Sequence, residues 1–367
     1  SDLSTELLHK ICKAKGIRIL TQSMTRIGYR GMISETTDFF DELFDSDKYL
    51  DVDIKNLDQL SAYVSQYRES TRKFIHKTQF STWKRLKAGL KFFISYYDTS
   101  YKNYYRNFGR TRWKILLNEG LISLRKICRT SFLNKNSIYQ IEENTQFVFF
   151  PIHFEPERAI SIASPFYTNQ IEVITQIAKS LPVGFLLYVK EHPVQKVTGW
   201  KDISFYKKIL ELSNVRLIHH SVSSEELLKK CSLVVTIAGT VGIEASFFGK
   251  PSIVLTDTQY SCLSFIHRLQ KIEDLPVAIK KAIGAKVDIV ELNKFVKFVF
   301  DNSFEYDELY MITELTYRFL YGGFPILDIS HKKMSEFLEE YRNVYEKITL
   351  EYMKKINFWK TKDSKTF

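Results

Sequence analysis

Between residues 145 and 255, short apolar runs alternate with amphipathic helical patterns, and the connections between them are short. The apolar runs are rich in β-branched residues, which favours buried strands. This alternation is typical of an α/β protein with a parallel, doubly wound sheet, whose ligands bind beyond the carboxyl ends of the strands. We predict strands at 147–152, 185–189, 215–218, 233–237 and 252–255, and helices at 169–180, at 205–212 and from Ser223 or Ser224 to Lys230.

The stretch from Leu233 to Pro251 is the most informative part of this pattern. An apolar strand leads into a turn of small residues, and the helix that follows ends at Gly249. A glycine turn that opens a helix offers backbone N–H groups and the positive end of the helix dipole to an anion. The other interpretation is a buried corner with a good helix cap. The candidate ligand-binding residues here are Gly239, Thr240, Val241, Gly242 and Glu244, the last placed to reach a ribose or sugar hydroxyl.

A second candidate lies where the strand at 185–189 ends, in Lys190-Glu191-His192-Pro193. Proline holds the residue before it extended, so the His192 imidazole would project over the sheet edge. There it could donate to a phosphate, and Lys190 would add positive charge. A His-Pro pair also occurs in plain turns. Ser223 and Ser224 are most simply helix caps, although a hydroxyl there could reach a nucleotide phosphate.

The loop after the first strand carries a third polar cluster, at His153, Glu155, Glu157 and Arg158. A carboxylate in this loop could act as a general base or hold a sugar hydroxyl. The alternative is a solvated loop with an Arg–Glu pair. His219 and His220 are adjacent at a strand end, where alternating side chains would diverge, so we do not expect them to share a metal. No metal site is expected elsewhere.

The net charge of +11 is concentrated in one segment. Residues 68–135 hold 17 Lys and Arg against 3 Asp and Glu, whereas the rest of the chain holds 36 against 39. An apolar stripe runs along the same segment at helical spacing: Trp83, Leu86, Leu90, Phe93 and Tyr97. An aromatic face beside a basic one suits an anionic membrane surface. A helical hairpin packed on the domain, a groove for an anionic polysaccharide and a nucleic-acid surface are the alternatives, and no nucleic-acid module supports the last.

The two ends of the chain differ from this centre. We predict a helix at 5–15 closed by Gly16, a strand at 17–20, and a loop with a short acidic helix within 21–53. No strand–helix unit precedes this strand, so we expect further residues upstream. The C-terminal part is predicted to be helical. The expected division is 1–66 (remnant of an N-terminal α/β domain), 67–140 (basic aromatic helices), 141–285 (Rossmann-like ligand-binding domain) and 286–367 (C-terminal helices).

The four cysteines, Cys12, Cys128, Cys231 and Cys262, form no Cys-x-x-Cys pair, which suits free thiols in a reducing compartment. No apolar run is long enough to span a membrane, and no signal-peptide pattern opens the chain. We therefore expect a cytoplasmic protein, peripheral on the inner face of the cytoplasmic membrane through residues 68–135.

Three motifs together resemble capsule and surface-polysaccharide biosynthesis glycosyltransferases, a family that includes capsular Kdo transferases and is akin to bacterial polysialyltransferases. They are Phe149-Phe-Pro-Ile-His-Phe-Glu-Pro-Glu-Arg158, Leu187-Tyr-Val-Lys-Glu-His-Pro193 and Ala238-Gly-Thr-Val-Gly-Ile-Glu-Ala245, the last followed by Phe248-Gly-Lys-Pro251. The resemblance covers about 145–260, and 17–35 loosely resembles the end of the family's N-terminal domain. The rest of that domain is not recognisable, and residues 68–135 match nothing that we can place in the family.

The resemblance implies a GT-B-like fold and a nucleotide-sugar donor, with His192 and Thr240-Val241-Gly242 at the donor phosphates and Glu244 close by. We expect metal-independent transfer of a sugar to a capsule, lipopolysaccharide or other surface-polysaccharide acceptor. The resemblance favours a CMP-sugar, with UDP- and GDP-sugars as alternatives. Glu155, Glu157 or Glu35 would serve as the base. The alternatives are a teichoic-acid-type polyol-phosphate transferase that uses a CDP-polyol, and a non-catalytic module that binds anionic glycan or membrane.

Overall fold

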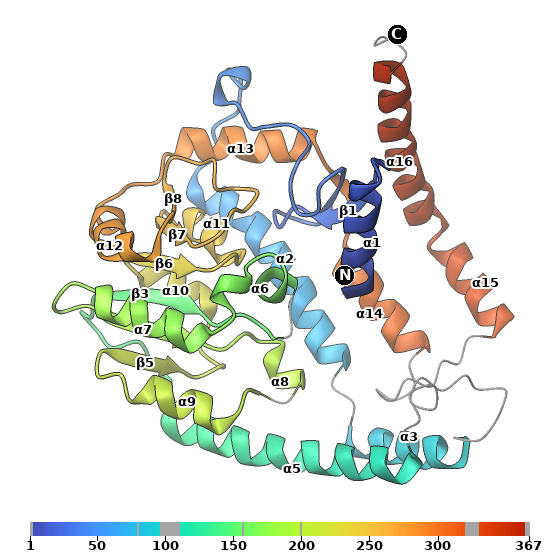
Figure 1. The fold of residues 1–367 in the computed structure, drawn as a ribbon, viewed down its shortest axis with the longest axis horizontal. Coiled ribbons are helices and arrows are strands. Elements are labelled where there is room, and N and C mark those ends of the chain that lie inside the picture. The colour runs from blue at the N-terminus through green and yellow to red at the C-terminus, as the bar shows by residue number, and fades with distance from the viewer. Residues whose placement is uncertain are drawn as a thin grey trace.

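The computed structural model describes residues 3–78, 81–95, 111–155, 158–198, 200–319 and 330–363. A six-stranded parallel sheet forms its centre, in the order β5-β4-β3-β6-β7-β8 (Figure 1). Its strands are β3 (Phe147–Pro151), β4 (Leu186–Lys190), β5 (Val215–Ile218), β6 (Leu233–Thr236), β7 (Ser252–Val254) and β8 (Ile266–Arg268). The predicted doubly wound α/β class is confirmed. β8 was not predicted, because three residues are too few to establish a pattern.

The order of the strands creates a crevice between β3 and β6. The chain begins the sheet at β3, adds β4 and β5 on one side, and then crosses to the other side for β6, β7 and β8. β3 and β6 are neighbours, with Phe149 beside Val234, yet their following connections run to opposite sides. In open α/β sheets, ligands bind at this point of reversal. When the six strands are numbered from one in chain order, they lie in the order 3-2-1-4-5-6, which is the order of dinucleotide-binding sheets.

Helices cover both faces of the sheet, because both faces are apolar. Val148 and Phe150 belong to the core beneath α7 (Gln170–Ser180), α9 (Ile203–Leu210) and α12 (Leu275–Ile283). Phe147 and Phe149 face the opposite core, with α10 (Ser224–Lys230) and α11 (Val241–Ser246). The predicted helices lie close to their observed positions, although α9 begins two residues earlier than its apolar pattern indicated. The short helices are α6 (Arg158–Ser161), α8 (Gln195–Thr198) and the 3-10 turns η1 (Ser46–Lys48), η2 (Pro165–Tyr167) and η3 (Ile272–Asp274).

A second, three-stranded sheet joins the two ends of the chain. Antiparallel strands β1 (Thr21–Met24) and β2 (Arg30–Ser34) form a hairpin, and β9 (Phe304–Glu305) pairs with β2. The helix α1 (Leu3–Ala14) ends before Gly16, as predicted. Gly16 adopts the left-handed conformation that glycine favours. The strand predicted at 17–20 is wrong, since the strand begins at Thr21. The predicted acidic helix is also wrong, because only η1 forms there. The strands of this sheet are set by the pairing of β2 with β1 and β9, which local sequence patterns do not show.

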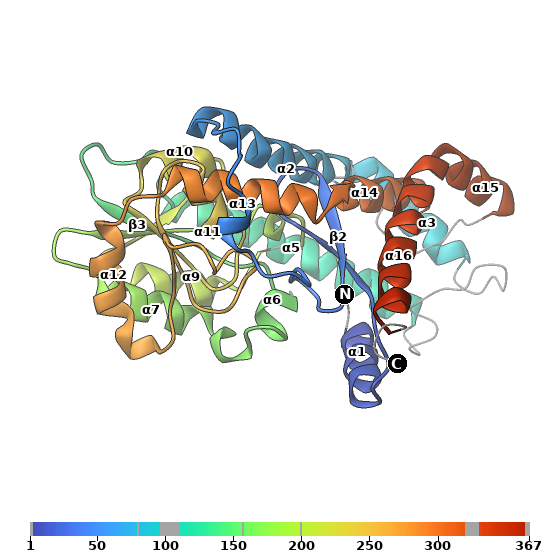
Figure 2. The ribbon, with the colours of Figure 1, turned by 90° about the horizontal axis from the view of Figure 1, so that it is seen from above.

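Within its described residues, the basic segment lies on three helices, α2 (Leu57–Thr78), α3 (Thr82–Ser95) and α5 (Arg112–Asn136). α2 packs against the body through Leu60 and Val64. The α3/α5 pair lies at one edge of the molecule, and Figures 1 and 2 show α5 running beneath the sheet domain towards α3. The predicted stripe does not pack inward, because Trp83, Leu86 and Leu90 are 60–76% exposed. The buried side of α3 is formed by Ala88 and Phe92, and Tyr97 lies outside the described residues.

The C-terminal part is helical, as predicted, apart from β9. It comprises α13 (Ile289–Asp301), α14 (Glu308–Phe319), α15 (His331–Glu340) and α16 (Arg342–Asp363). α13 packs on the sheet domain beside α2, and α14 packs along α2. Phe337 and Tyr341 are buried in a small cluster with Met311 and Phe319. None of the described helices is long and apolar enough to span a membrane.

Candidate functional site at the carboxyl edge of the sheet

Three connections meet at the carboxyl edge of the sheet: those that follow β3, β4 and β6. The loop after β3 touches the turn after β6 through His153, whose Nε2 lies 3.1 Å from Thr236 Oγ1 and accepts from the Ile237 N–H at 3.3 Å. The charges of Glu244 and Lys190 act on the His192 ring, so the connection after β4 lies at the same place. The three motifs therefore converge on the crevice between β3 and β6.

His153 supports this crevice from below. Burial lowers its pKa to about 3, with further lowering by the charge of His192 and its neighbours. The imidazole is therefore neutral at physiological pH. Because Nε2 accepts the Ile237 N–H, the ring proton belongs to Nδ1 in this tautomer. His153 fixes the β6 turn and does not offer a charged donor to a ligand.

The two turn glycines are required by close packing. A Cβ on Gly239 would lie 2.7 Å from Thr236 Oγ1 and 3.1 Å from His153 Cε1. A Cβ on Gly242 would lie 2.7 Å from Tyr260 Oη, and that hydroxyl donates to the Gly239 carbonyl. From the sequence, we expected both glycines to let a phosphate approach the backbone closely. The structure gives a packing reason for each, and their contact with a phosphate stays a prediction.

His192 lies half-buried at the edge, and its hydrogen bonding fixes its tautomer. Its Nδ1 accepts the Val194 N–H at 3.2 Å, which leaves the proton on Nε2. Burial lowers the pKa of His192 to about 4, and Lys190 and Lys201 lower it further, while Glu244 acts in the opposite direction. The residue is thus a neutral hydrogen-bond donor over a wide pH range.

Lys190, Ser223 and Ser224 form one cluster at the start of α10. The Lys190 Nζ donates to the Val222 carbonyl at 2.6 Å and to Ser224 Oγ at 2.8 Å. Burial lowers the pKa of Lys190 to about 8, and the positive charges of Arg68 and Arg72 lower it further. Ser223 is the N-cap of α10, as predicted, and accepts from the Glu225 N–H at 3.2 Å. The cluster is positively charged and lies next to the crevice.

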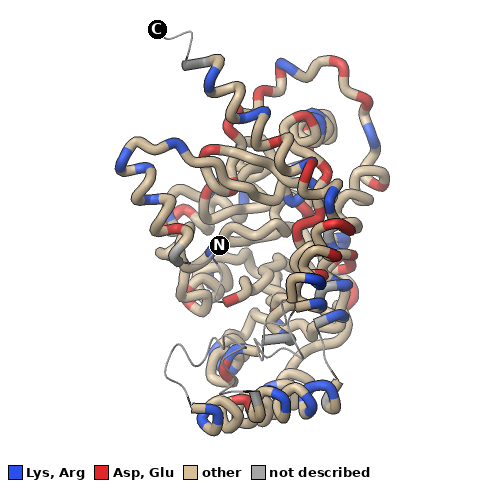
Figure 3. Tube along the Cα trace, turned by 90° about the vertical axis from the view of Figure 1, so that its right-hand side faces the viewer, with Lys and Arg blue, Asp and Glu red and all other residues tan. Residues whose placement is uncertain are grey.

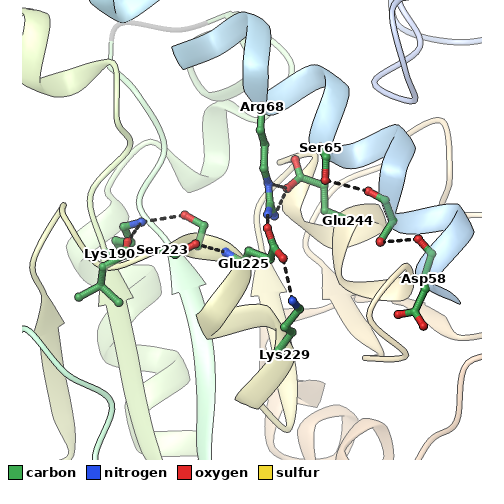
Figure 4. A network of polar contacts seen from close by, with 11 residues as sticks. Asp58, Ser65, Arg68, Lys190, Ser223, Glu225, Lys229 and Glu244 are labelled. Carbon is green, nitrogen blue, oxygen red and sulfur yellow. Dashed lines mark hydrogen bonds and ion pairs between the residues drawn. The ribbon is translucent and has the colours of Figure 1, made fainter. Parts of the chain in front are cut away.

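Glu244 is buried, and its main partner comes from a distant part of the chain. Arg68 on α2 donates to Glu244 Oε2 through Nη2 at 2.8 Å and through Nε at 3.2 Å (Figure 4). Thr240 Oγ1 donates to Glu244 Oε1 at 2.8 Å, and it makes no capping bond to α11. The sequence indicated Arg68 only as a member of the basic segment, because no local pattern links it to Glu244.

The turn between β1 and β2 also approaches this place. Arg26 adopts a left-handed φ of 69°, and its charge acts on both His153 and Tyr260. Burial raises the pKa of Tyr260, which keeps its hydroxyl protonated for the bond to Gly239. Arg30, at the start of β2, binds the segment that follows α13, with its Nε 2.7 Å from Ser303 Oγ.

The three candidate bases have separate surroundings. Glu155 lines a polar pocket of about 520 Å³ together with Arg129, Lys201 and Lys208. Its carboxylate accepts from Gln170 Nε2 and lies 3.1 Å from Lys201 Nζ. Glu35 is exposed and accepts from Trp359 Nε1 of α16, so it does not join the three motifs. Glu157 lies outside the described residues.

The alternative was an Arg–Glu pair within this loop, but among the described residues of the loop no carboxylate pairs with Arg158. Arg158 instead binds Glu6 of α1, with Nε 3.2 Å from Oε2, and also pairs with Asp38. Both partners come from the N-terminal region, which is far from Arg158 in the sequence. The pairing therefore ties the loop after β3 to the first fifty residues, a contact that only the tertiary fold creates.

His219 and His220 do not diverge as predicted, because the backbone leaves the strand at Ile218. Their ring centroids are 4.0 Å apart, and His219 Nδ1 lies 2.7 Å from Ser221 Oγ. Two Asp-x-Asp pairs, Asp45/Asp47 and Asp51/Asp53, lie exposed before α2. Within the described part of the chain, no group of three or more His, Cys, Asp or Glu residues could hold a metal ion.

Comparison with known proteins bears on the same region. Residues 95–266 match the family model described as capsule polysaccharide biosynthesis protein. The resemblance inferred from the motifs is thereby confirmed for this part of the chain. The match also begins earlier than we expected: it includes the second half of the basic segment, so our statement that this segment has no counterpart in the family is wrong from residue 95 onward. No curated protein matches the chain.

Solved structures with similar folds include two Kdo transferases and an epimerase. The β-Kdo 2,7 transferase KpsC of Thermosulfurimonas dismutans is 11% identical, with 80% of each chain covered and a TM-score of 0.36. Its β-Kdo 2,4 transferase is 12% identical over 79% of this chain and 74% of that one, with a TM-score of 0.36. The UDP-GlcNAc 2-epimerase of Neisseria meningitidis is 16% identical over 44% and 45%, with a TM-score of 0.32. At these scores the likenesses carry no argument about activity.

Proposed function

We propose that the protein is a glycosyltransferase of capsule or other surface-polysaccharide biosynthesis, with a nucleotide-sugar donor bound in the crevice between β3 and β6. The observation that carries the proposal is the convergence of three motifs at the point where the strand order reverses. The family match over residues 95–266 supports it. The motifs lie far apart in the sequence, and the parallel sheet brings them to one edge.

The polar groups of the crevice suit the departure of a nucleotide. The Nε2–H of His192 would donate to a phosphate oxygen, and Lys190 would add positive charge. Fixed donors of this kind stabilise the negative charge that develops on a leaving phosphate. The backbone of Thr240, Val241 and Gly242 would lie against the phosphates, as the family resemblance implies, while the Thr240 hydroxyl and Glu244 would accept from the ribose.

Of the three candidate bases, we favour Glu155. It lines a pocket at the same edge, and Phe154 beside it lies 6.2 Å from the His192 ring. The three cations in this pocket suit an acidic glycan acceptor. Glu155 would take a proton from the acceptor hydroxyl as the new glycosidic bond forms, while the nucleotide leaves with the bonding electrons. A metal-independent reaction and a cytidine nucleotide are part of this proposal.

We further propose that the enzyme binds an anionic membrane surface through the α3/α5 pair. Lys and Arg positions recur along both helices, at the bottom of the view in Figure 3. A groove of about 1080 Å³ between the helices is lined by Leu86, Leu90, Phe93 and Trp113, with Arg85 and Lys126 among the charged residues. Localisation at the inner face of the cytoplasmic membrane stays a prediction.

The decisive experiment is a thermal-shift panel with CMP, CDP, UDP and GDP. A ligand that binds only the folded state raises the melting temperature by mass action, and we expect the largest shift with a cytidine nucleotide. If no nucleotide raises it, the enzyme proposal fails and a glycan-binding role remains. A larger shift with UDP or GDP would overturn only the choice of base.

The role of His192 is tested in the same assay. His192→Ala should weaken nucleotide binding about tenfold or more, because it removes a hydrogen bond to a charged phosphate. His219→Ala is the matched control: His219 also follows a strand end, but it bonds Ser221 and Asn134. Full nucleotide affinity in His192→Ala would remove this residue from the phosphate site.

A further inference from the structure

The chain of contacts Arg68–Glu244–Thr240 links α2 to the donor crevice. Glu244 is 6% exposed, yet both of its carboxylate oxygens are hydrogen-bonded. Arg68 supplies two N–H groups to one oxygen, and Thr240 supplies its hydroxyl proton to the other. Figure 4 shows Arg68 reaching down from α2 to Glu244, with Lys190 and the start of α10 on the other side.

The direction of these hydrogen bonds determines what the chain can recognise. Because the Thr240 proton points at Glu244, the hydroxyl oxygen offers lone pairs to anything else that approaches it. Glu244, as a carboxylate, also offers only acceptors. A phosphate is itself an acceptor and gains nothing from such a pair. A vicinal diol carries two O–H donors and complements it.

The position of the Glu244 carboxylate depends on Arg68. A buried carboxylate needs a cation and hydrogen bonds to compensate its charge. Arg68 supplies both; its side chain is 15% exposed and its Nη1 lies 3.8 Å from Glu225 as well. Without Arg68, Oε2 would lose the two N–H groups that hold it, and the carboxylate would no longer be fixed to accept from the diol.

We propose that Arg68 is the positioning residue that sets the specificity of the donor site for a ribonucleotide, by fixing the Glu244 carboxylate and thereby keeping Thr240 turned as an acceptor for the ribose diol. This inference rests on the proposed function. It assigns to α2, which lies outside the three motifs of the sheet domain, a part in donor recognition. Phosphate recognition stays with His192 and Lys190 on the opposite side of the crevice.

The alternative is that Arg68 only ties α2 to α11. A structural tie would affect all nucleotides equally, whereas a positioning role changes the ratio of affinities for ribo and dideoxyribo forms. Arg72 provides the matched control, because it lies one turn further along α2, is exposed, and acts on Lys190 only through its charge. Arg72→Gln removes the same charge from the same helix without touching Glu244.

The experiment measures calorimetric affinities of the full chain for CMP and UDP and for their 2′,3′-dideoxy analogues. We expect the wild type to prefer the ribo forms by about tenfold or more, as expected when a bond to a charged acceptor is lost. Arg68→Gln also removes a positive charge and should weaken all four ligands, but it should lose the preference for the ribo forms. Arg72→Gln should weaken all four ligands by similar factors.

The outcomes separate the two proposals. If the wild type binds none of the four ligands, the proposed function fails and this inference fails with it. If the wild type binds them without preferring the ribo forms, or Arg68→Gln keeps the preference, only the role of Arg68 is overturned. Arg68→Lys guards against a folding defect: it keeps the charge but not the paired N–H groups, so an intermediate preference supports the proposal and an unchanged one contradicts it.

Discussion

Three consecutive side chains, Lys190, Glu191 and His192, show how strongly the fold divides neighbouring residues. Lys190 turns to the start of α10, and His192 lies at the ligand edge. Glu191 points into the core, where Tyr206 Oη donates to its Oε2 at 2.6 Å. Burial raises the pKa of Glu191 to about 7, against the lowering effects of Lys201 and Tyr206. Glu191 is therefore a buried acid of the core, although its two neighbours in the motif lie at the edge of the sheet.

Glu191→Gln should make the protein more stable at neutral pH. Between about pH 4.5 and 7 the carboxyl is ionised when unfolded but keeps its proton when folded, so the wild type loses stability as the pH rises through this window. At about 1.4 kcal/mol per pKa unit, the loss reaches up to about 3 kcal/mol. The gain of the variant should therefore be small near pH 4 and largest above pH 7, as measured by urea unfolding.

The buried histidine works in the opposite direction but cancels in this comparison. His153 has a pKa of about 3 in the folded protein. The protein therefore becomes less stable as the pH falls below the pKa of a free imidazole, and it does so equally in wild type and variant. Glu211→Gln, at an exposed position after α9, controls for the removal of one charge. A Glu191→Gln difference that does not change with pH would contradict the assignment.

At the scale of elements, the α3/α5 pair is unlike the other helices. Leu117, Leu124 and Ile127 of α5 are 61–68% exposed, whereas the end of α5 is anchored by the buried Leu133. Thr130 accepts from Trp200 Nε1 at 2.9 Å, and Arg129 donates to the Trp200 carbonyl. One end of α5 thus belongs to the sheet domain, while the rest presents a large apolar surface beside basic residues. Such surfaces on soluble domains mark interaction sites.

Leu86→Ser together with Leu90→Ser should weaken binding to vesicles that contain phosphatidylglycerol by about tenfold, because two apolar side chains no longer enter the interface. Lys87→Glu with Lys91→Glu should weaken it too, and added salt should reduce this second effect. Both can be measured by vesicle sedimentation. Leu43→Ser with Leu50→Ser is the control, since these leucines are 89% and 78% exposed elsewhere. Binding equal to wild type in both test variants would rule out this surface.

At the scale of the whole molecule, the first and last parts of the chain form one structure. β2 lies between β1 and β9, and Arg30 extends this connection to the end of α13. Its Nη2 donates to the Phe300 carbonyl at 2.9 Å, and its guanidinium lies 4.4 Å from the Phe300 ring centroid. α14 then packs along α2, which carries Arg68. The arrangement of α2 beside the crevice therefore depends on both ends of the chain.

Arg30→Ala should destabilise the protein by about 3 kcal/mol, because three hydrogen bonds from a charged group and a cation–π contact are lost together. Urea unfolding followed by circular dichroism would measure this. Arg342→Ala is the control: Arg342 is exposed and pairs with neighbouring Glu339, so its removal should cost much less than that of Arg30. A similar, small effect of both substitutions would show that the link between the ends is weak.

The sheet domain could be predicted because its information is local. Runs such as 147–151 and 233–236 are apolar on both faces, and caps such as Asn169 and Ser223 mark where helices begin. The same patterns indicated the carboxyl edge and hence the candidate residues Lys190, His192 and Thr240. The hairpin β1–β2 could not be predicted in this way, because its stability comes from pairing with β9, nearly three hundred residues away.

The sequence by itself therefore determined the parallel sheet, the edge at which a ligand would bind, and the basic character of residues 68–135. The tertiary structure decided which side chains meet at that edge. It brought Arg68 to Glu244 across 176 positions, turned Glu191 into the core, and required Gly239 and Gly242 for packing. Periodicity and capping act within a few residues and can be read along the chain, whereas compensation of a buried charge depends on whatever the fold places beside it.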